Sequence, residues 1–335
     1  MISPVYDDTL AAADRLKGVV IRTPLLRCPV LSERFAAQIY LKAENLQHTG
    51  SFKFRGAYNA LSQIPESEKP KGVLAISSGN HGQGVAEAAR LLGIRATVLM
   101  PDDAPRVKIA RTQASGADVV FYNRLADDRD LMTSEHLSRT GAILIHPFNN
   151  VDVIAGQGTV GLEIADALQA EDLVPDILLS CTGGGGLTAG IALACSASFP
   201  DLQIFSVEPD GFDDYRRSLL AGAIVTNKLT TGSICDAILT LAPGEIGFSI
   251  NRDRLRGGLS VSDPEALQAV RFIFEKHRMV AEPGGAVALA AILSGKLEAH
   301  IGSLTGKTIV ATVSGGNVDH TVFLEALECG ILTRF

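Results

Sequence analysis

The chain has 335 residues, enough for about two domains of ~150 residues, and its 46% hydrophobic and 20% charged residues are typical of a globular protein. Thirty basic and 37 acidic residues give a formal charge of −7, which argues against a nucleic-acid partner because such partners select a basic face. No apolar run approaches the ~18 residues of a membrane span and residues 1–17 lack a basic secretory start, so we expect a soluble cytoplasmic protein.

Short apolar segments rich in β-branched residues recur along the chain and alternate with helical patterns. We predict strands at 38–42, 73–77, 96–100, 118–122, 143–146, 177–181, 203–207 and 308–313. Several of these segments are nearly all apolar, as expected for strands of a parallel sheet that is covered on both faces. Predicted helices include 85–92, which stops before Gly93, and one that begins at Asp263-Pro264-Glu265 with a capping acid. The sequence therefore predicts an α/β fold.

The segments between 70 and 148 follow one another in a compact βαβ rhythm, and no Ser/Gly linker or charge block marks a domain boundary. We therefore expect residues 70–148 to form a smaller domain inserted into a larger one, which is made of residues 1–69 and 149–335.

A run of glycines follows the predicted strand at 177–181 and precedes an Ala-rich helix. In Cys181-Thr182-Gly183-Gly184-Gly185-Gly186-Leu187, backbone N–H groups can converge on one point beside the positive end of the helix, which favours a phosphate. A turn that only permits close helix packing is the structural alternative. Gly184, Gly186 and Ala189 also match the dinucleotide pattern G-x-G-x-x-A, with Glu208 closing the next strand, so a nicotinamide dehydrogenase is a second alternative.

Two further segments favour a different chemistry. Lys53 lies between two aromatic residues in Gly50-Ser51-Phe52-Lys53-Phe54-Arg55-Gly56-Ala57, where burial would lower the pKa of its amine and allow it to form an imine. The alternative is a solvated surface lysine. The segment Ser77-Ser78-Gly79-Asn80-His81 ends a predicted strand and begins a helix, so its N–H groups can bind a carboxylate.

The chain resembles the fold-type II pyridoxal-phosphate enzymes, in the group of threonine and serine dehydratases, serine racemase and 3-hydroxyaspartate dehydratase. The resemblance extends from Arg22-Thr23-Pro24-Leu25 to Ser314-Gly315-Gly316-Asn317 and rests on S-F-K-x-R-G-A, S-x-G-N-H and the glycine run, in that order. It implies a fold like that of the tryptophan synthase β chain, with two open, twisted, mostly parallel sheets and helices on both faces. The larger domain would bind the cofactor and the smaller one the substrate.

By this resemblance, Lys53 would bind pyridoxal 5'-phosphate covalently and act as the base at the substrate Cα, and residues 183–187 would hold the phosphate. Phe52 would lie against the pyridine ring, with core packing as the alternative, and Asn80 would donate to the ring's 3-oxygen. Ser314 would bond the pyridine nitrogen. A neutral hydroxyl there withdraws few electrons, which favours prompt loss of a β-substituent. Glu282 would be an acid near the ring, with a helix-capping carboxylate as the alternative.

The resemblance also implies a divalent-cation loop and a substrate site. Glu208, the Phe212 carbonyl and Asp214 would bind Mg²⁺ or Ca²⁺, with a solvated acidic turn as the alternative. We expect the substrate to contact residues from two segments, namely Ser77, Ser78, Asn80, His81 and Arg129.

Two of these residues bear on the choice of substrate. Ser78 would protonate the opposite face of Cα, as in the racemase and hydroxyaspartate branches. Arg129 would reach a second carboxylate, although pairing with its acidic neighbours is an equally open alternative. Phe148, where serine racemase has asparagine, and Ile234-Cys235-Asp236-Ala237 depart from that branch.

We therefore predict a dehydratase that eliminates water from serine, threonine or 3-hydroxyaspartate and releases ammonia and an oxo acid. The alternative within the family is a serine or aspartate racemase with side dehydratase activity. A catalytically silent amino-acid or cofactor-binding protein is the alternative outside the enzyme class. We expect a homodimer without nucleic-acid or membrane partners.

Overall fold

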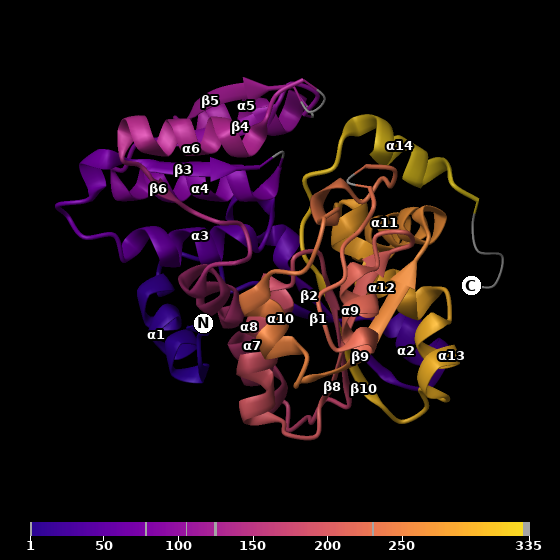
Figure 1. Ribbon diagram of the computed structural model, residues 1–335. Helices are drawn as coiled ribbons and strands as arrows, with labels where there is room; N and C mark the ends of the chain where they lie inside the picture. The colour runs from indigo at the N-terminus through magenta and orange to yellow at the C-terminus, as the bar shows by residue number, and fades with distance from the viewer. Residues whose placement is uncertain (1, 78, 105, 124–125, 230, 331–335) are drawn as a thin grey trace.

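The computed structural model describes residues 2–77, 79–104, 106–123, 126–229 and 231–330 of the chain. These residues form two sheets with helices around each (Figure 1). The larger sheet has the described strand order β1-β2-β10-β7-β8-β9, parallel throughout except for the β1–β2 pair. Its strands are β1 (Leu25–Arg27), β2 (Gln38–Ala43), β7 (Ile177–Cys181), β8 (Gln203–Pro209), β9 (Leu255–Val261) and β10 (Thr308–Val313).

The smaller sheet has the described order β5-β4-β3-β6 and is parallel throughout. Its strands are β3 (Val73–Ile76), β4 (Ala96–Pro101), β5 (Asp118–Tyr122) and β6 (Ile143–Leu144). The prediction of an α/β fold with two mostly parallel sheets is confirmed. The last of these strands ends before Ile145 and His146, although the prediction extended it to 146.

Two strands of the larger sheet are absent from the predicted set, and both lie at its edges. β1 has three residues and pairs antiparallel, and β9 contains Gly257 and Gly258, which are unfavourable residues for a strand. Gly258 allows close packing, since a Cβ there would lie 2.6 Å from the Ser206 hydroxyl. Tertiary packing therefore decides a strand that local propensity disfavours.

The larger sheet is covered on both faces because its strands bury side chains in both directions. Ile39 and Leu41 of β2 pack with one set of helices, whereas Tyr40 between them packs with the other. The first set comprises α2 (Pro29–Phe35), α11 (Asp263–His277), α12 (Pro283–Leu293) and α13 (Lys296–Ile301), and the second comprises α7 (Val151–Gln169) and α8 (Gly186–Ser198). Every residue of α12 is buried, as its uniformly apolar sequence requires.

The helix predicted to begin at Asp263 does begin there, but the residue that caps it is Ser262 and not Asp263. α11 begins at Asp263, but its N-cap is Ser262, whose backbone N–H donates to the Glu265 carboxylate (2.7 Å). Pro264 occupies the first turn, where a missing N–H has no consequence. Asp263 instead accepts hydrogen bonds from the segment at 233–234.

The smaller sheet packs against α3 (Lys53–Ser62) and α4 (Asn80–Leu92), with an apolar core that includes Phe54, Leu61, Val85 and Val98. Leu74 on the opposite face packs with the side chains of α6 (Arg129–Thr140). α3 also contacts α7 of the larger sheet. The helix that carries Lys53 therefore lies between the two sheets.

The remaining described helices are α1 (Tyr6–Leu16), α5 (Arg106–Ala114), α9 (Asp214–Ala221), α10 (Glu245–Asn251) and α14 (His320–Glu328), with short 3₁₀ turns η1 (Glu44–Leu46), η2 (His48–Gly50), η3 (Lys69–Lys71) and η4 (Asp236–Ile238). Within the described ranges, no helix combines the length and the apolar character needed to cross a bilayer.

Candidate active site

Lys53 is placed by backbone contacts between the start of α3 and the segment after β10. Ser51 forms a bridge with Gly315, and the Phe52 N–H donates to the Ser314 carbonyl (3.2 Å). The chain turns into this contact through Gly50, whose φ of +74° favours glycine. Lys53 therefore lies at the carboxyl end of β10, the edge at which α/β sheets bind ligands.

Lys53 is part-buried, and its amine donates to the Pro147 carbonyl (2.8 Å). Burial lowers its pKa to about 8, and the nearby Glu282 carboxylate opposes this shift only in part. The alternative of a solvated surface lysine is therefore wrong. The amine also lies 5.2 Å from the centroid of the Phe52 ring, which packs in turn on the apolar core beneath α8. The core-packing alternative for Phe52 thus agrees with the structure.

Asn80 and Glu282 lie together although 202 residues separate them. The Asn80 amide donates to Glu282 Oε1, and Asn80 Oδ1 accepts from the Asn317 amide (2.8 Å). Glu282 occupies the N-cap position of α12, but its side chain makes no capping hydrogen bond. The helix-capping alternative is therefore wrong for the side chain, which points to Asn80 instead.

Two charged residues that are absent from the predicted site, a buried lysine and an aspartate, lie near Glu282. Lys108 of α5 lies 2.5 Å from Asp236 of η4 and 3.8 Å from Glu282 Oε2, which has no hydrogen-bond partner among the described residues. Burial raises the pKa of Glu282, Lys108 opposes the shift and Asp236 adds to it. The only sequence signal for Lys108 is its position one helical turn before the buried Thr112.

The predicted carboxylate loop links β3 to α4. Ser77 Oγ accepts from the Gly79 N–H (3.1 Å), and the N–H groups of the first turn of α4 lack partners within the helix. The His81 side chain is buried with Nε2 2.8 Å from the Ile145 carbonyl, and burial together with Lys53 lowers its pKa to about 3. His81 is therefore neutral, and it faces the smaller sheet. Ser78 lies outside the described residues.

The glycine loop connects β7 to α8 as predicted. Gly185 has a φ of +86°, and a Cβ at Gly184 or Gly185 would lie 2.3 Å from the Phe148 ring or 2.2 Å from the Tyr215 ring. Close packing, the structural alternative, therefore explains these two glycines. It leaves open what binds the N–H groups of Gly186 and Leu187 at the start of α8.

Ser314 follows β10 and is 5% exposed. Its backbone bonds Phe52 and Gly285, which fixes it beside Lys53. His146, a residue without a predicted role, lies near the same amine. Burial, Lys53 and Arg129 lower its pKa to about 4, and its Nδ1 accepts from the Asn149 N–H (2.9 Å).

The structure pairs Arg129 with its neighbour Asp130 (2.9 Å), and just over half of its side chain is exposed. The alternative of an arginine paired with acidic neighbours therefore describes the structure, and no contact joins Arg129 to the described residues around Lys53. Its charge nevertheless helps to lower the pKa of His146, which follows β6 beside Pro147.

In the acidic loop after β8, Glu208 and Asp214 are buried, whereas Asp210 and Gly211 are exposed, so the alternative of a solvated turn holds for part of the loop only. Glu208 accepts from the N–H groups of Tyr215 and Arg216 (2.8 Å each). Asp214 Oδ1 accepts from Asn227 (2.6 Å), whereas Oδ2 has no partner among the described residues. Burial raises the pKa of both carboxyls. The described part of the chain contains no group of three or more His, Cys, Asp and Glu side chains placed to bind a metal.

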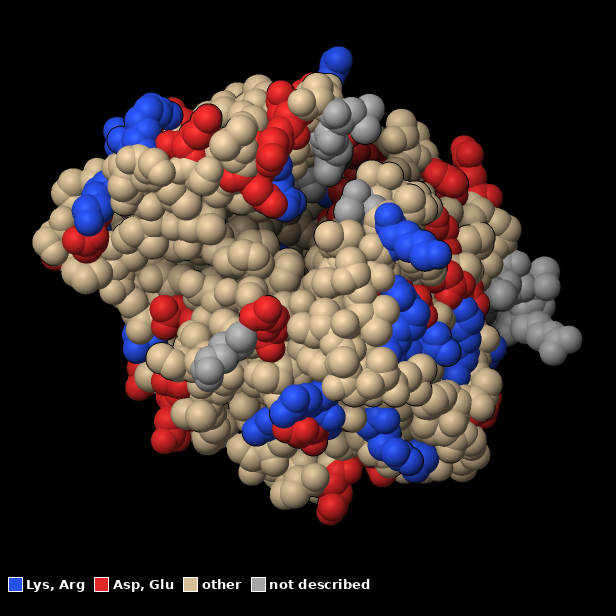
Figure 2. All heavy atoms as spheres, in the orientation of Figure 1, with Lys and Arg blue, Asp and Glu red and all other residues tan. Residues whose placement is uncertain are grey.

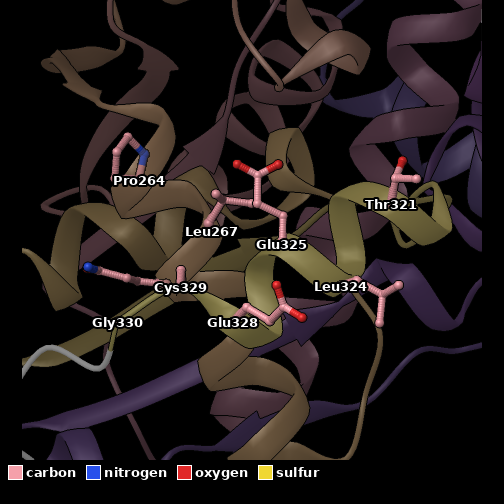
Figure 3. A pocket seen from close by; sticks show the side chains of 9 residues that line it. Pro264, Leu267, Thr321, Leu324, Glu325, Glu328, Cys329 and Gly330 are labelled. Carbon is pink, nitrogen blue, oxygen red and sulfur yellow. The ribbon is translucent and has the colours of Figure 1, made fainter.

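A cavity of about 630 Å³ lies elsewhere, between α11 and α14, and is lined by residues such as Leu267, Leu324 and Glu328 (Figure 3). None of its lining residues is a predicted site residue. The candidate site is therefore assigned by its side chains and by its place at the strand ends.

Comparison with known proteins identifies the family. A family model described as "Pyridoxal-phosphate dependent enzyme" matches residues 16–315. The chain is 41% identical to an L-threo-3-hydroxyaspartate ammonia-lyase of Saccharomyces cerevisiae, over 95% of each chain. It is 39% identical to a serine racemase of Schizosaccharomyces pombe, over 95% of this chain and 96% of the other.

A solved threonine deaminase of "T.th." superposes with a TM-score of 0.87 and 41% identity, over 94% of this chain and 99% of that chain. The resemblance inferred from the motifs is thereby confirmed, and the dehydrogenase alternative is set aside. The chain belongs to the family of pyridoxal-phosphate-dependent enzymes.

Proposed function

We propose that this chain is an ammonia-lyase that eliminates water from serine, threonine or 3-hydroxyaspartate and releases ammonia and an oxo acid. The observation that carries the proposal is the part-buried Lys53 amine, with a pKa of about 8, between the two sheets. The names of the relatives, an L-threo-3-hydroxyaspartate ammonia-lyase and a threonine deaminase, support the same reaction class.

The residues around Lys53 fit pyridoxal phosphate. Lys53 offers an amine for the aldehyde, residues 183–187 offer N–H groups for the phosphate, and Asn80 and Ser314 offer polar groups for the ring. Oε2 of buried Glu282 lies 3.8 Å from the Lys108 amine but accepts no hydrogen bond from a described residue, which supports a polar ligand at this place. When bound, the cofactor supplies an electron-withdrawing ring that stabilises negative charge at the substrate Cα.

Lys53 is the proposed base. With a pKa of about 8, a fraction of its amine is unprotonated near neutral pH and can accept the Cα proton. The Pro147 carbonyl orients the amine through its hydrogen bond. The substrate carboxylate is proposed to bind the first turn of α4, where Ser77, Asn80 and His81 contribute polar and N–H groups.

The racemase remains the alternative because a relative named as a serine racemase is nearly as similar. Racemisation needs a second proton donor on the opposite face of Cα, and we propose Ser78 for that role. Arg129 is the proposed partner of a second substrate carboxylate. Its exposed pair with Asp130 is weak, so the guanidinium can exchange partners at small cost.

Glu208, Asp214 and the Phe212 carbonyl are the proposed ligands of a divalent cation. Two fully buried carboxylates, one with an oxygen that lacks a partner among the described residues, support a cation here because hard cations select oxygen ligands. The ion would neutralise charge at the start of α9 and so stabilise the fold.

The domain division stays a proposal at the predicted boundaries, with residues 70–148 on the substrate side and residues 1–69 and 149–335 on the cofactor side. The separate sheets support it, whereas α3 packs on the smaller sheet although it precedes residue 70. We also propose that the protein is a cytoplasmic homodimer.

A substrate panel tests the function. The purified, cofactor-loaded protein is incubated with both enantiomers of serine and threonine and with the stereoisomers of 3-hydroxyaspartate, and ammonia, oxo acid and enantiomer ratios are measured. We expect oxo acid and ammonia in equal amounts from at least one substrate. Lys53→Ala should lower this turnover by several orders of magnitude, because both the cofactor anchor and the base are lost. Enantiomer exchange without ammonia would favour the racemase, and unchanged turnover in the variant would refute the assignment of Lys53.

A further inference from the structure

A second cavity lies away from the candidate active site, along the edge strand β9. Its volume is about 550 Å³, within the range of small-molecule sites, and it lies between α9, α13 and the strand. Its wall follows β9 from Leu255 to Ser260, which is all of the strand except Val261. The predicted site residues lie beyond the carboxyl ends of the strands, and none of them lines this cavity.

The lining is cationic although the chain as a whole is acidic. Arg216, Arg252, Arg256 and Lys296 line the cavity, and no described Asp or Glu does. Figure 2 shows Lys and Arg side chains gathered over the part of the surface where β9 lies in Figure 1. In a chain with a formal charge of −7, such a concentration of one sign creates a local positive potential that attracts anions.

The cationic groups are available to a ligand. Arg256 is exposed and has no hydrogen bond or ion pair with any residue that the structure describes. Arg216 and Arg252 are bound to carboxylates outside the cavity, Asp213 at 2.8 Å and Asp253 at 3.5 Å. Both arginines are at least two-fifths exposed, and the Arg252–Asp253 pair, exposed on both sides, contributes little free energy, so a ligand can replace it; Asp213 is more buried and keeps Arg216 at the rim of the cavity.

Lys296 is the fixed member of the set. Its amine donates to the Ser260 carbonyl (2.9 Å) and is paired with Glu265 (2.8 Å) and, at a longer distance, with Asp210 (3.8 Å), which holds it at the edge of the sheet. The cavity also has an apolar part, formed by Leu219, Leu255 and Leu259. This combination suits a compact polyanion with or without an apolar portion better than it suits an uncharged ligand.

We propose that the cavity between α9, β9 and α13 binds a small polyanion, a metabolite that carries several phosphate or carboxylate groups. Arg256, Arg252 and Arg216 donate charge-assisted hydrogen bonds to its oxygens, and Lys296 adds a fixed positive charge. The proposal is independent of the reaction at Lys53.

Isothermal titration calorimetry of the cofactor-loaded enzyme tests this site with two probes, inorganic tripolyphosphate and citrate. The loaded enzyme is used so that the predicted phosphate loop at 183–187 is occupied by the cofactor. We expect one tripolyphosphate to bind per chain. Its affinity should fall as the NaCl concentration rises from about 50 to about 200 mM, because salt screens the attraction between the arginines and the anion. Citrate distinguishes the source of the charge. If it binds equally well, the site accepts polycarboxylates, and if it does not, the site selects phosphates.

Arg256→Ala should weaken tripolyphosphate binding by about tenfold, the loss that one charge-assisted hydrogen bond predicts. Arg252→Ala combined with Arg256→Ala should weaken it further, and amino-acid turnover should not change. Arg139→Ala removes an exposed arginine of α6 and is the charge-matched control, which should bind like the parent protein. Absence of binding by the parent, or equal losses in the Arg139 and Arg256 variants, would overturn the proposal.

Discussion

Replacement of Arg55 tests whether a buried ion cluster holds the helix that carries Lys53. Arg55 is fully buried, and its guanidinium donates to both oxygens of Glu44 (2.8 Å each) and both oxygens of Glu163 (2.7 and 2.9 Å). Lys42 also binds Glu163 (2.5 Å), so two cations balance two carboxylates. The cluster joins α3 to α7 and to the segment after β2.

Arg55→Met leaves two buried carboxylates with one cation. Loss of one partner of a buried ion pair costs about 3–5 kcal/mol, because the remaining charge stays desolvated. We expect a free-energy loss in this range from urea unfolding followed by circular dichroism. Adding Glu44→Gln to the same variant restores charge balance, so the double variant should lose at least about 1 kcal/mol less than the sum of the single losses.

Arg90→Ala is the matched control, because the Arg90–Glu87 pair has a similar separation (2.7 Å) but lies at the surface. We expect no measurable change in its unfolding curve. An Arg55→Met protein as stable as the parent would refute the inference that the cluster contributes to stability. Additive losses in the double variant would refute the charge-balance argument.

Three further outcomes are expected at the candidate site. The first concerns cofactor-free protein, in which the rate of reconstitution by pyridoxal phosphate is followed by absorbance. Because only the unprotonated Lys53 amine reacts, this rate should rise about tenfold per pH unit below pH 8 and level off above it. A rate that does not change with pH would contradict the lowered pKa of Lys53. Lys108 lowers the pKa of Glu282 and Asp236 raises it. Lys108→Gln should therefore move any pH-dependent change in the bound cofactor's spectrum to higher pH, and Asp236→Asn should move it to lower pH. Shifts of both variants in the same direction would argue against this electrostatic account. Added Mg²⁺ or Ca²⁺ should raise the melting temperature of the parent but not of Asp214→Ala, with about 2.7 kcal/mol of stabilisation at an ion concentration one hundred times Kd; a chelator without effect on the parent would remove the proposed cation site.

Several parts of the site that could be predicted from sequence follow strands. Asn80, residues 183–187 and Ser314 come directly after β3, β7 and β10, and parallel strands bring their carboxyl ends to one edge. A local motif after a strand therefore has a predictable place even when its partners are distant in sequence. The same logic places Lys53 there, because the segment before it bridges Gly315.

The charges that tune the site could not be predicted in this way. Lys108 lies on a helix and Asp236 on a short turn, 128 residues apart, and only the packing of α5 near η4 brings them together. Arg129 shows the converse case. Its sequence neighbours already offer a carboxylate, and the structure uses the nearest one. Local sequence cannot decide between such partners, because their free-energy differences are small at the surface.

The two buried charge clusters differ in a way that separates structure from function. Around Arg55, every buried carboxylate oxygen has a hydrogen-bond donor, and the cluster is closed. Around Lys53, His81 Nδ1 and the Ser51 and Thr49 hydroxyls are buried without hydrogen-bond partners among the described residues, and Glu282 Oε2, 3.8 Å from the Lys108 amine, accepts no hydrogen bond from them either. Unpaired buried polar atoms destabilise a fold, so their concentration in three segments that meet at one amine indicates that a polar ligand completes them. The closed cluster fixes α3 in the fold, and the open one leaves polar groups free for the cofactor and substrate that we propose to bind there.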